Sequence, residues 1–212
     1  MNDLVFIDPN KIGAVPFTTS KVVSEWSGVG HKKIKEAIRK YRRDIESFGL
    51  LDSYQTESTG GRPEEFYRMN EAQATFLLTL LKNTEPVIKF KKELVRQFYA
   101  MRTELMKRRD YREALKPIRR EMTDVIQEIN HSKWDYKLYT DLSYRAVTGK
   151  SAAQLRKEKD APKDANIIEY LTADEIERVA GLQQKIGLLL ELGMEYYQIK
   201  DLLLNRQMIR AS

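Results

Sequence analysis

Apolar residues recur every three or four positions along most of the chain, which is the spacing of one face of an α-helix. In residues 31–48 the apolar positions are Ile34, Ala37, Ile38, Tyr41, Ile45 and Phe48. In residues 18–27 they are Val22, Val23 and Trp26, and the sequence Gly-Val-Gly at 28–30 separates the two segments. The pattern predicts a helix-turn-helix in which Thr18 or Thr19 caps the first helix.

Strand-like runs lie on both sides of the helix-turn-helix. Residues 4–7 (LVFI) predict a short strand, and residues 50–57 and 65–69 predict two more. Turn-forming residues fill the interval between the last two runs, which favours a β-hairpin with Gly60 and Gly61 at its tip. The order helix, turn, helix, hairpin is that of a winged helix.

Two further helices are expected before the middle of the chain. Asn70 with Gln73 resembles a capping box that begins a helix over 71–82, and this helix has so little polar surface that we place it in the centre of the core. The next helix begins at 84–86 and has an apolar stripe at Val87, Phe90, Leu94, Phe98, Met101 and Leu105. Pro117 is expected to end or kink any helix that reaches it.

The remaining sequence is expected to be wholly helical. The predicted helices lie at 117–130, 134–147, 151–159, 172–191 and 195–204. The fourth begins with a capping box of Thr172 and Glu175, and Gly193 follows its end. Most tyrosines of this region are expected in the core, although tyrosine also suits a protein interface.

The predicted fold class is therefore mainly α, with an α+β domain at the N-terminus. We expect a winged-helix-like domain at 1–106, a helical linker at 107–130 and an all-α domain at 131–212. A chain of 212 residues is long enough for each domain to bury a core of its own.

Positive charge is concentrated in the first part of the chain. Residues 1–120 contain 24 Lys and Arg against 16 Asp and Glu, whereas residues 121–212 contain 13 against 15. A localised basic surface is typical of proteins that bind a polyanion, most often a nucleic acid, although Lys and Arg can also simply keep helices soluble. The run 82–120 has 13 cations and five acids, and it is either a solvated face or a second surface for phosphates.

Composition argues against thiol and metal-dependent chemistry. The chain has no cysteine and only two histidines, so we expect no metal and no cofactor. Gly149-Lys150-Ser151 resembles the end of a phosphate-binding loop, but Tyr144 stands where that motif needs its first glycine. Because no other catalytic motif is recognisable, we expect that the protein is not an enzyme. The absence of a long apolar run, with Asp3 and Asp8 near the start, predicts a cytoplasmic protein without membrane contact.

Four blocks of sequence stand in a characteristic order. They are 15–32 (VPFTTSKVVSEWSGVGHK), 60–64 (GGRPE), 69–81 (MNEAQATFLLTLL) and 87–102 (VIKFKKELVRQFYAMR). Together they resemble the Rha family of phage regulatory proteins over about residues 15–105. The resemblance implies a phage-encoded regulator or antirepressor, acting in the bacterial host cell, with a winged-helix-like N-terminal domain. A weaker resemblance at 136–155, 170–172 and 192–194 implies an oligomerisation or partner-binding domain.

The second predicted helix carries the candidate DNA-binding residues. Its exposed face would present Lys32, Lys33 and Lys35 to the major groove, and Arg39, Arg42 and Arg43 to the phosphate backbone. His31 would contact a phosphate or base, cap the helix, or pack against Trp26. Arg62, beside the hairpin glycines, would contact a phosphate or the minor groove, or merely belong to a tight turn.

Two functions fit these residues. The first is a transcriptional regulator that binds double-stranded DNA, as a homodimer or a higher homo-oligomer joined by its C-terminal helices. The second is an antirepressor that binds and inactivates a phage repressor protein, so that the basic helix meets an acidic protein surface. Phosphate contacts make affinity fall steeply with salt, whereas a protein interface with apolar anchors is much less sensitive.

Overall fold

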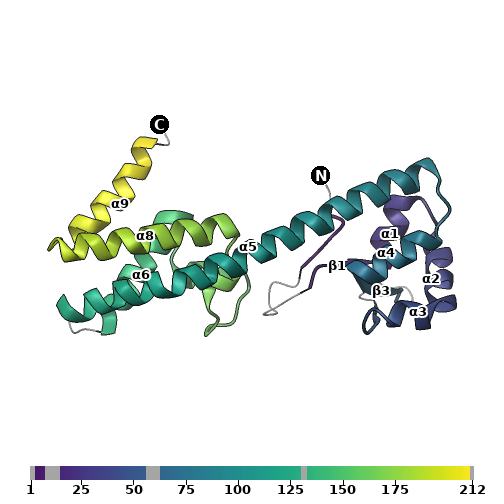
Figure 1. Ribbon diagram of the computed structural model, residues 1–212, viewed down its shortest axis with the longest axis horizontal. Helices are drawn as coiled ribbons and strands as arrows, with labels where there is room; N and C mark the ends of the chain where they lie inside the picture. Colours follow the sequence, from purple (N-terminus) through teal and green to yellow (C-terminus); the bar gives the residue numbers. More distant parts are fainter. Residues whose placement is uncertain (1–2, 8–14, 56–62, 130–132, 211–212) are drawn as a thin grey trace. The chain divides into compact units, whose positions relative to one another are not determined.

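The computed structural model describes residues 3–7, 15–55, 63–129 and 133–210. Contacts divide the chain into two compact units, Met1–Thr103 and Glu104–Ser212. The fold is mainly α, as predicted, with a three-stranded antiparallel sheet in the N-terminal unit (Figure 1). Within the described ranges, no helix is both long and apolar enough to span a membrane.

The N-terminal unit combines a helix-turn-helix with the sheet. In chain order its elements are β1 (Phe17–Thr19), α1 (Ser20–Ser27), α2 (His31–Lys40), α3 (Arg42–Glu46), β2 (Asp52–Gln55), β3 (Glu65–Asn70), α4 (Glu71–Leu80) and the first part of α5 (Glu85–Ile129). Strands β2 and β3 pair antiparallel as the hairpin prediction requires, with Asp52 opposite Arg68 and Gln55 opposite Glu65. Strand β1 pairs with the other edge of β3, so the strand order is β1-β3-β2.

The start of this unit differs from the prediction in two places. Thr18 is not helical but lies in β1, and Thr19 is the residue that caps α1, its Oγ1 accepting a hydrogen bond from the N–H of Val22 at 3.2 Å. The predicted strand at 4–7 is wrong, because Phe6 makes only an isolated bridge to Phe17. Leu4 and the residue after it are both buried, whereas consecutive residues of a strand point to opposite faces.

The second predicted helix is interrupted. Residues 31–48 form α2 and α3, which are separated at Tyr41, where a φ of −106° and a ψ of 27° leave the helical region. The apolar spacing continues across this break, and Ile34, Ile38 and Ile45 are all fully buried. A periodic pattern cannot reveal one residue off the helical path when both segments still reach the same core.

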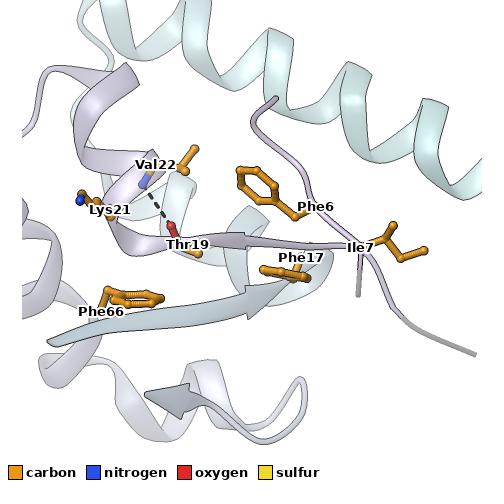
Figure 2. Close-up of a pocket in the computed structure, with 7 residues that line it drawn as sticks. All are labelled: Phe6, Ile7, Phe17, Thr19, Lys21, Val22 and Phe66. Carbon is orange, nitrogen blue, oxygen red and sulfur yellow. Dashed lines mark hydrogen bonds between the residues drawn. The ribbon is translucent and has the colours of Figure 1, made fainter. Parts of the chain in front are cut away.

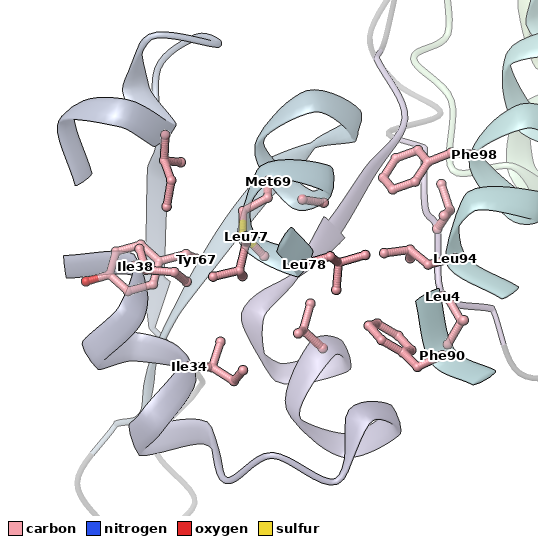
Figure 3. Packing of buried hydrophobic residues seen from close by; sticks show 14 of the residues in the cluster. Leu4, Ile34, Ile38, Tyr67, Met69, Leu77, Leu78, Phe90, Leu94 and Phe98 are labelled. Atoms are coloured by element: carbon pink, nitrogen blue, oxygen red, sulfur yellow. The ribbon is translucent and has the colours of Figure 1, made fainter. Parts of the chain in front are cut away.

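One cluster of buried side chains joins the elements of the N-terminal unit (Figure 3). It includes Ile34, Ile38, Tyr67, Met69, Leu77, Leu78, Phe90, Leu94 and Phe98. The start of the stripe predicted on α5 is confirmed, because Val87, Phe90, Leu94 and Phe98 are at most 3% exposed. This cluster fixes α2 through its buried isoleucines and leaves the opposite side of that helix free for other roles.

Helix α4 begins as predicted but is less buried than predicted. Asn70 Oδ1 accepts a hydrogen bond from the N–H of Gln73 at 2.9 Å, and Gln73 Oε1 accepts one from the N–H of Asn70 at 3.0 Å. The helix ends at Leu80, before the predicted end, and it exposes Thr75 and Thr79. These threonines stand four residues apart and therefore share one face of the helix. The prediction overlooked this narrow polar face because most other residues of the helix are apolar.

The C-terminal unit is built from helices in its described part. It contains the second part of α5, α6 (Lys133–Thr148), α7 (Ala152–Glu158), the 3₁₀ helix η1 (Ile167–Tyr170), α8 (Ala173–Glu191) and α9 (Tyr196–Arg210). The predicted capping box of Thr172 and Glu175 begins α8, and Gly193 follows its end with a φ of +79°. That φ lies in the left-handed region, where glycine has no side chain to clash, so the prediction of a glycine stop is confirmed.

Of the two outcomes predicted for Pro117, the end of a helix is wrong. Helix α5 continues through it to Ile129, and residues 117–130 do not form a separate helix. A proline in a helix interior costs about 3 kcal/mol. Leu115 before it and Met122 after it are both buried, and burial of such side chains contributes about 1.5–3 kcal/mol each, which is enough to offset that cost.

Candidate nucleic-acid interface

Helix α2 has one buried side and one basic side. Ile34 and Ile38 are fully buried, while Lys32, Lys33 and Arg39 are exposed. The other predicted cations are Lys35, which is half-buried on α2, and Arg42 and Arg43, which are exposed on α3. With His31, the first residue of α2, seven of the eight predicted site residues therefore lie on the two consecutive helices that follow the turn.

Three of these cations are already engaged with glutamates or the backbone. Arg39 forms an ion pair with Glu65 of β3 at 2.8 Å, and Arg42 forms one with Glu46 at 2.8 Å. The Nζ of Lys35 donates to the backbone carbonyl of Glu65 at 3.4 Å. Exposed ion pairs contribute only about 0.2–1 kcal/mol, so a phosphate can replace these carboxylates at little cost.

Lys32, Lys33 and Arg43 take part in none of the ion pairs found in the described part of the chain. Their charge is therefore not neutralised locally by a carboxylate. Lys32 and Lys33 also lie in the first turn of α2, which contains no acidic residue and has no side-chain cap. Cations at a helix N-terminus oppose the helix dipole, whereas an anion there is stabilised by it and by the free N–H groups. This end of α2 is suited to a phosphate.

His31 is held by protein groups on both sides of its ring. Its Nε2 lies 3.0 Å from Ser20 Oγ, and its Nδ1 lies 2.6 Å from Glu64 Oε1. Ser20 Oγ also accepts the backbone N–H of Tyr67 at 2.9 Å, and an ionised Glu64 can only accept, so the Nδ1 proton of His31 lies toward Glu64. His31 therefore connects the start of α1, the start of α2 and the residue before β3.

This arrangement also acts on Glu64. The hydrogen bond with His31 is the largest effect on this carboxyl and lowers its pKa below the ordinary value, and partial burial opposes it. Glu64 is therefore ionised under ordinary conditions and anchors the imidazole. Neither Ser20 nor Glu64 was predicted as a site residue, because contacts across 11 and 33 positions leave no local spacing to recognise.

Ser20, His31 and Glu64 are hydrogen-bonded in the order of a hydrolytic triad. A nucleophilic serine must reach a substrate carbonyl with its oxygen, with oxyanion donors nearby. Ser20 has an exposed fraction of 0%, and its oxygen already accepts a backbone N–H. The same three groups instead fix the position of the first turn of α2.

A known protein family matches nearly the whole of the N-terminal unit. Residues 18–103 match the family model of the phage regulatory protein Rha. The N-terminal unit is a Rha-family domain. The match begins in β1 and ends in α5, so it includes the helix-turn-helix, both strands of the hairpin and α4. Residues 18–103 are thus similar to a phage regulatory protein, while no curated protein matches the chain.

The hairpin of the Rha-family domain bears on the Arg62 prediction. Arg62, Gly60 and Gly61 lie outside the described residues, so their placement stays a prediction. The pair formed by Gln55 and Glu65 closes the described part of the hairpin, and Glu65 is the residue that contacts Arg39 and Lys35 of α2. The end of the strand pair nearest the hairpin loop and the basic side of α2 are therefore adjacent in the Rha-family domain.

The basic run at 82–120, which begins within the Rha-family domain, is neutralised only in part by its own helix. Ion pairs along α5 join Lys89 to Glu85, Arg96 to Glu93, Arg108 to Glu104, and Lys116 to Glu113. These partners stand three or four residues apart, as is usual on an exposed helix face. These four pairs account for four of the 13 cations at 82–120, so both predictions for the run, a solvated face and a second surface for phosphates, stay predictions.

The Gly149-Lys150-Ser151 sequence, outside the Rha-family domain, connects two helices. Gly149 has a φ of +75° just after α6, and Ser151 caps α7 in a capping box with Gln154. Lys150 forms an ion pair with Glu158. These roles account for all three residues and confirm that the sequence is not a phosphate-binding loop, which would follow a strand.

Proposed function

We propose that this phage regulatory protein binds double-stranded DNA, with α2 in the major groove and the β2–β3 hairpin beside it. The observation that carries the proposal is the uncompensated positive charge at the start of α2, opposite two fully buried isoleucines. The major groove is about 12 Å wide and admits a helix of this kind. No catalytic step forms part of the proposed function.

Each cation has a stated role in this proposal. Lys32 and Lys33 lie in the first turn, which is the part of a recognition helix that reaches base edges. Arg39, Arg42 and Arg43 bind backbone phosphates, the first two by exchanging Glu65 and Glu46 for phosphate oxygens. Lys35 and His31 act from within the protein: Lys35 contacts the start of β3 at Glu65, and His31 holds the first turn of α2.

The test is fluorescence anisotropy with random duplex DNA across a salt series. The variant combines three substitutions at unpaired cations, Lys32→Ala, Lys33→Ala and Arg43→Ala. On random DNA, where Lys32 and Lys33 have no specific base to contact, all three cations are expected to bind phosphates. The slope of log K against log salt then becomes shallower by about 2.7, since each phosphate contributes about 0.9. The wild-type protein is expected to bind tightly at low salt.

A matched control removes the same charge elsewhere. Lys157, Lys159 and Lys163 are exposed in the C-terminal unit, and their combined change to alanine alters net charge equally. This control is expected to keep the wild-type slope. Absence of binding by the wild type at low salt, or equal loss in both triple variants, would refute DNA binding through α2.

A second proposal is the antirepressor function, which an exposed apolar surface favours. Leu50 is 83% exposed and Phe48 is 47% exposed, and the ring of Phe48 contacts that of Phe76 with centroids 5.8 Å apart. Exposed apolar side chains of this size are typical anchors of protein interfaces. In this proposal the chain releases the repressor of the same phage from its operator, and Leu50→Glu abolishes the release while salt has little effect.

We also propose that the protein forms a homo-oligomer through its C-terminal unit. Leu188 and Leu192 stand four residues apart at the end of α8, and Leu192 is 79% exposed. Light scattering should show a multimer for the wild type and a smaller species for Leu192→Lys. Leu50→Lys is the matched control, because it changes an equally exposed leucine of the other unit. A monomeric wild type would refute this proposal.

A further inference from the structure

One face of the sheet in the N-terminal unit does not join the core. Thr18 of β1 and Tyr67 of β3 are buried, so the residues on either side of them point to the opposite face. That outer face presents Phe17, Phe66 and Arg68, each of which is only partly buried. The guanidinium carbon of Arg68 lies 3.5 Å from the centre of the Phe17 ring.

The outer face is hollowed beside β1, and Figure 2 shows the side chains around this aromatic pocket. Its apolar walls are Phe6, Ile7, Phe17, Val22 and Phe66. Backbone hydrogen bonds of 2.8 and 2.9 Å between Phe6 and Phe17 hold the first wall in place. The cavity volume of about 560 Å³ lies within the range of small-molecule sites, about 300–1,000 Å³.

The polar groups of the aromatic pocket are few, and its charge is positive. Thr19 and Lys21 complete the lining, and neither they nor the apolar walls carry a negative charge. Lys21 is exposed, lies in the first turn of α1, and joins none of the ion pairs in the described part of the chain. The helix has no acidic residue in that turn. Lys21 and the dipole of α1 therefore both favour an anionic group.

We propose that the aromatic pocket binds a small planar aromatic anion, such as an aromatic carboxylate. The ring would lie among the phenylalanines, where aromatic pairs are favourable in offset or edge-to-face arrangements. The carboxylate would lie at Lys21 at the rim. A neutral ring would gain no attraction from Lys21, and an aliphatic chain would lose the aromatic contacts.

The pocket is connected to the first turn of α2 by residues of α1. Thr19 lines the pocket and caps α1, and Lys21 and Val22 belong to that helix. Ser20, between them, bonds to His31 and to the backbone of Tyr67. A ligand that shifts the start of α1 therefore changes the position of His31, and we infer that it alters DNA affinity. This second half of the proposal rests on the proposed function.

The experiment follows backbone amide signals of the full chain by NMR during titration with 2-naphthoate. Signals of Phe17, Lys21 and Phe66 are expected to shift in a saturable way. Lys21→Met should weaken binding about threefold, as for an exposed ion pair, and Phe66→Ala about tenfold, as for loss of an aromatic partner. The neutral analogue 2-naphthylmethanol should bind to the wild type about as weakly as 2-naphthoate binds to Lys21→Met.

Matched controls are Lys92→Met and Tyr99→Ala, both exposed on α5 and away from the pocket lining. Each should leave 2-naphthoate binding unchanged. Shifts confined to other residues, equal affinity for the neutral analogue, or pocket signals that move with protein concentration alone would overturn the proposal. Unchanged DNA affinity with saturating 2-naphthoate would overturn its second half. If 2-naphthoate binds while DNA does not, the proposed function fails and the pocket remains.

Discussion

Replacement of Ser20 by alanine tests whether one buried hydroxyl holds the helix-turn-helix to the sheet. Ser20 Oγ accepts the N–H of Tyr67 at 2.9 Å and lies 3.0 Å from Nε2 of His31, with no exposure to solvent. In Ser20→Ala the N–H of Tyr67 loses its acceptor inside the protein, which costs about 1–3 kcal/mol. The lost bond to His31 adds about 0.5–1.5 kcal/mol. We expect the free energy of unfolding of the N-terminal unit to fall by about 1.5–4.5 kcal/mol.

Urea unfolding followed by tryptophan fluorescence measures this loss. Trp26 lies in the N-terminal unit and Trp134 in the C-terminal unit, so the series is built on Trp134→Phe to report the first unit alone. Ser24→Ala is the matched control, because it makes the same chemical change within α1 at a partly buried position. A difference of less than about 0.5 kcal/mol between Ser20→Ala and Ser24→Ala, within the spread of ordinary surface substitutions, would refute this role of the hydroxyl.

Three further predictions concern stability. The lowered pKa of Glu64 means that its contact with His31 stabilises the fold above the unfolded value of about 4.5 and is lost as pH falls through the lower folded value. Glu64→Gln should therefore flatten the decline of stability in acid, as measured by urea unfolding at pH 3 to 6, and an unchanged profile would count against this contact. Phe98→Ala should lower the free energy of unfolding of the N-terminal unit by about 3–5 kcal/mol, whereas Tyr99→Ala should change it by less than about 0.5 kcal/mol. Thermal unfolding of both variants measures the difference. Thr172→Ala should cost the C-terminal unit about 1 kcal/mol through loss of the α8 cap, and Thr172→Ser should restore it.

Features encoded by neighbouring residues were predictable from the sequence. The helix-turn-helix follows from apolar spacing and two glycines, and the capping boxes at Asn70 and Thr172 follow from residues three positions apart. The same reasoning identified the basic side of α2, because burial of Ile34 and Ile38 determines which side chains face outward. In each case the determining residues lie within one or two helical turns.

Features that depend on distant residues were not predictable. Strand β1 has only three residues, and its pairing with β3 crosses about fifty positions. Helix α5 continues through Pro117 because buried side chains on both sides stabilise it. The residues next to a proline do not reveal how much stability such burial adds. The bonds of His31 to Ser20 and Glu64 exist only after the sheet has formed.

The pairing of β1 with β3 also determines the order in which this unit can fold. Strand β1 precedes the helix-turn-helix and β3 follows it, so the strand pair closes a loop that contains α1, α2 and α3. Contacts between distant residues form late, because the entropy of closing such a loop must be overcome first. A chain growing from its N-terminus holds every cation of α2 before it holds any residue of β3. A nascent or truncated chain that stops before residue 65 therefore has the charges of the basic helix without the arrangement that directs them.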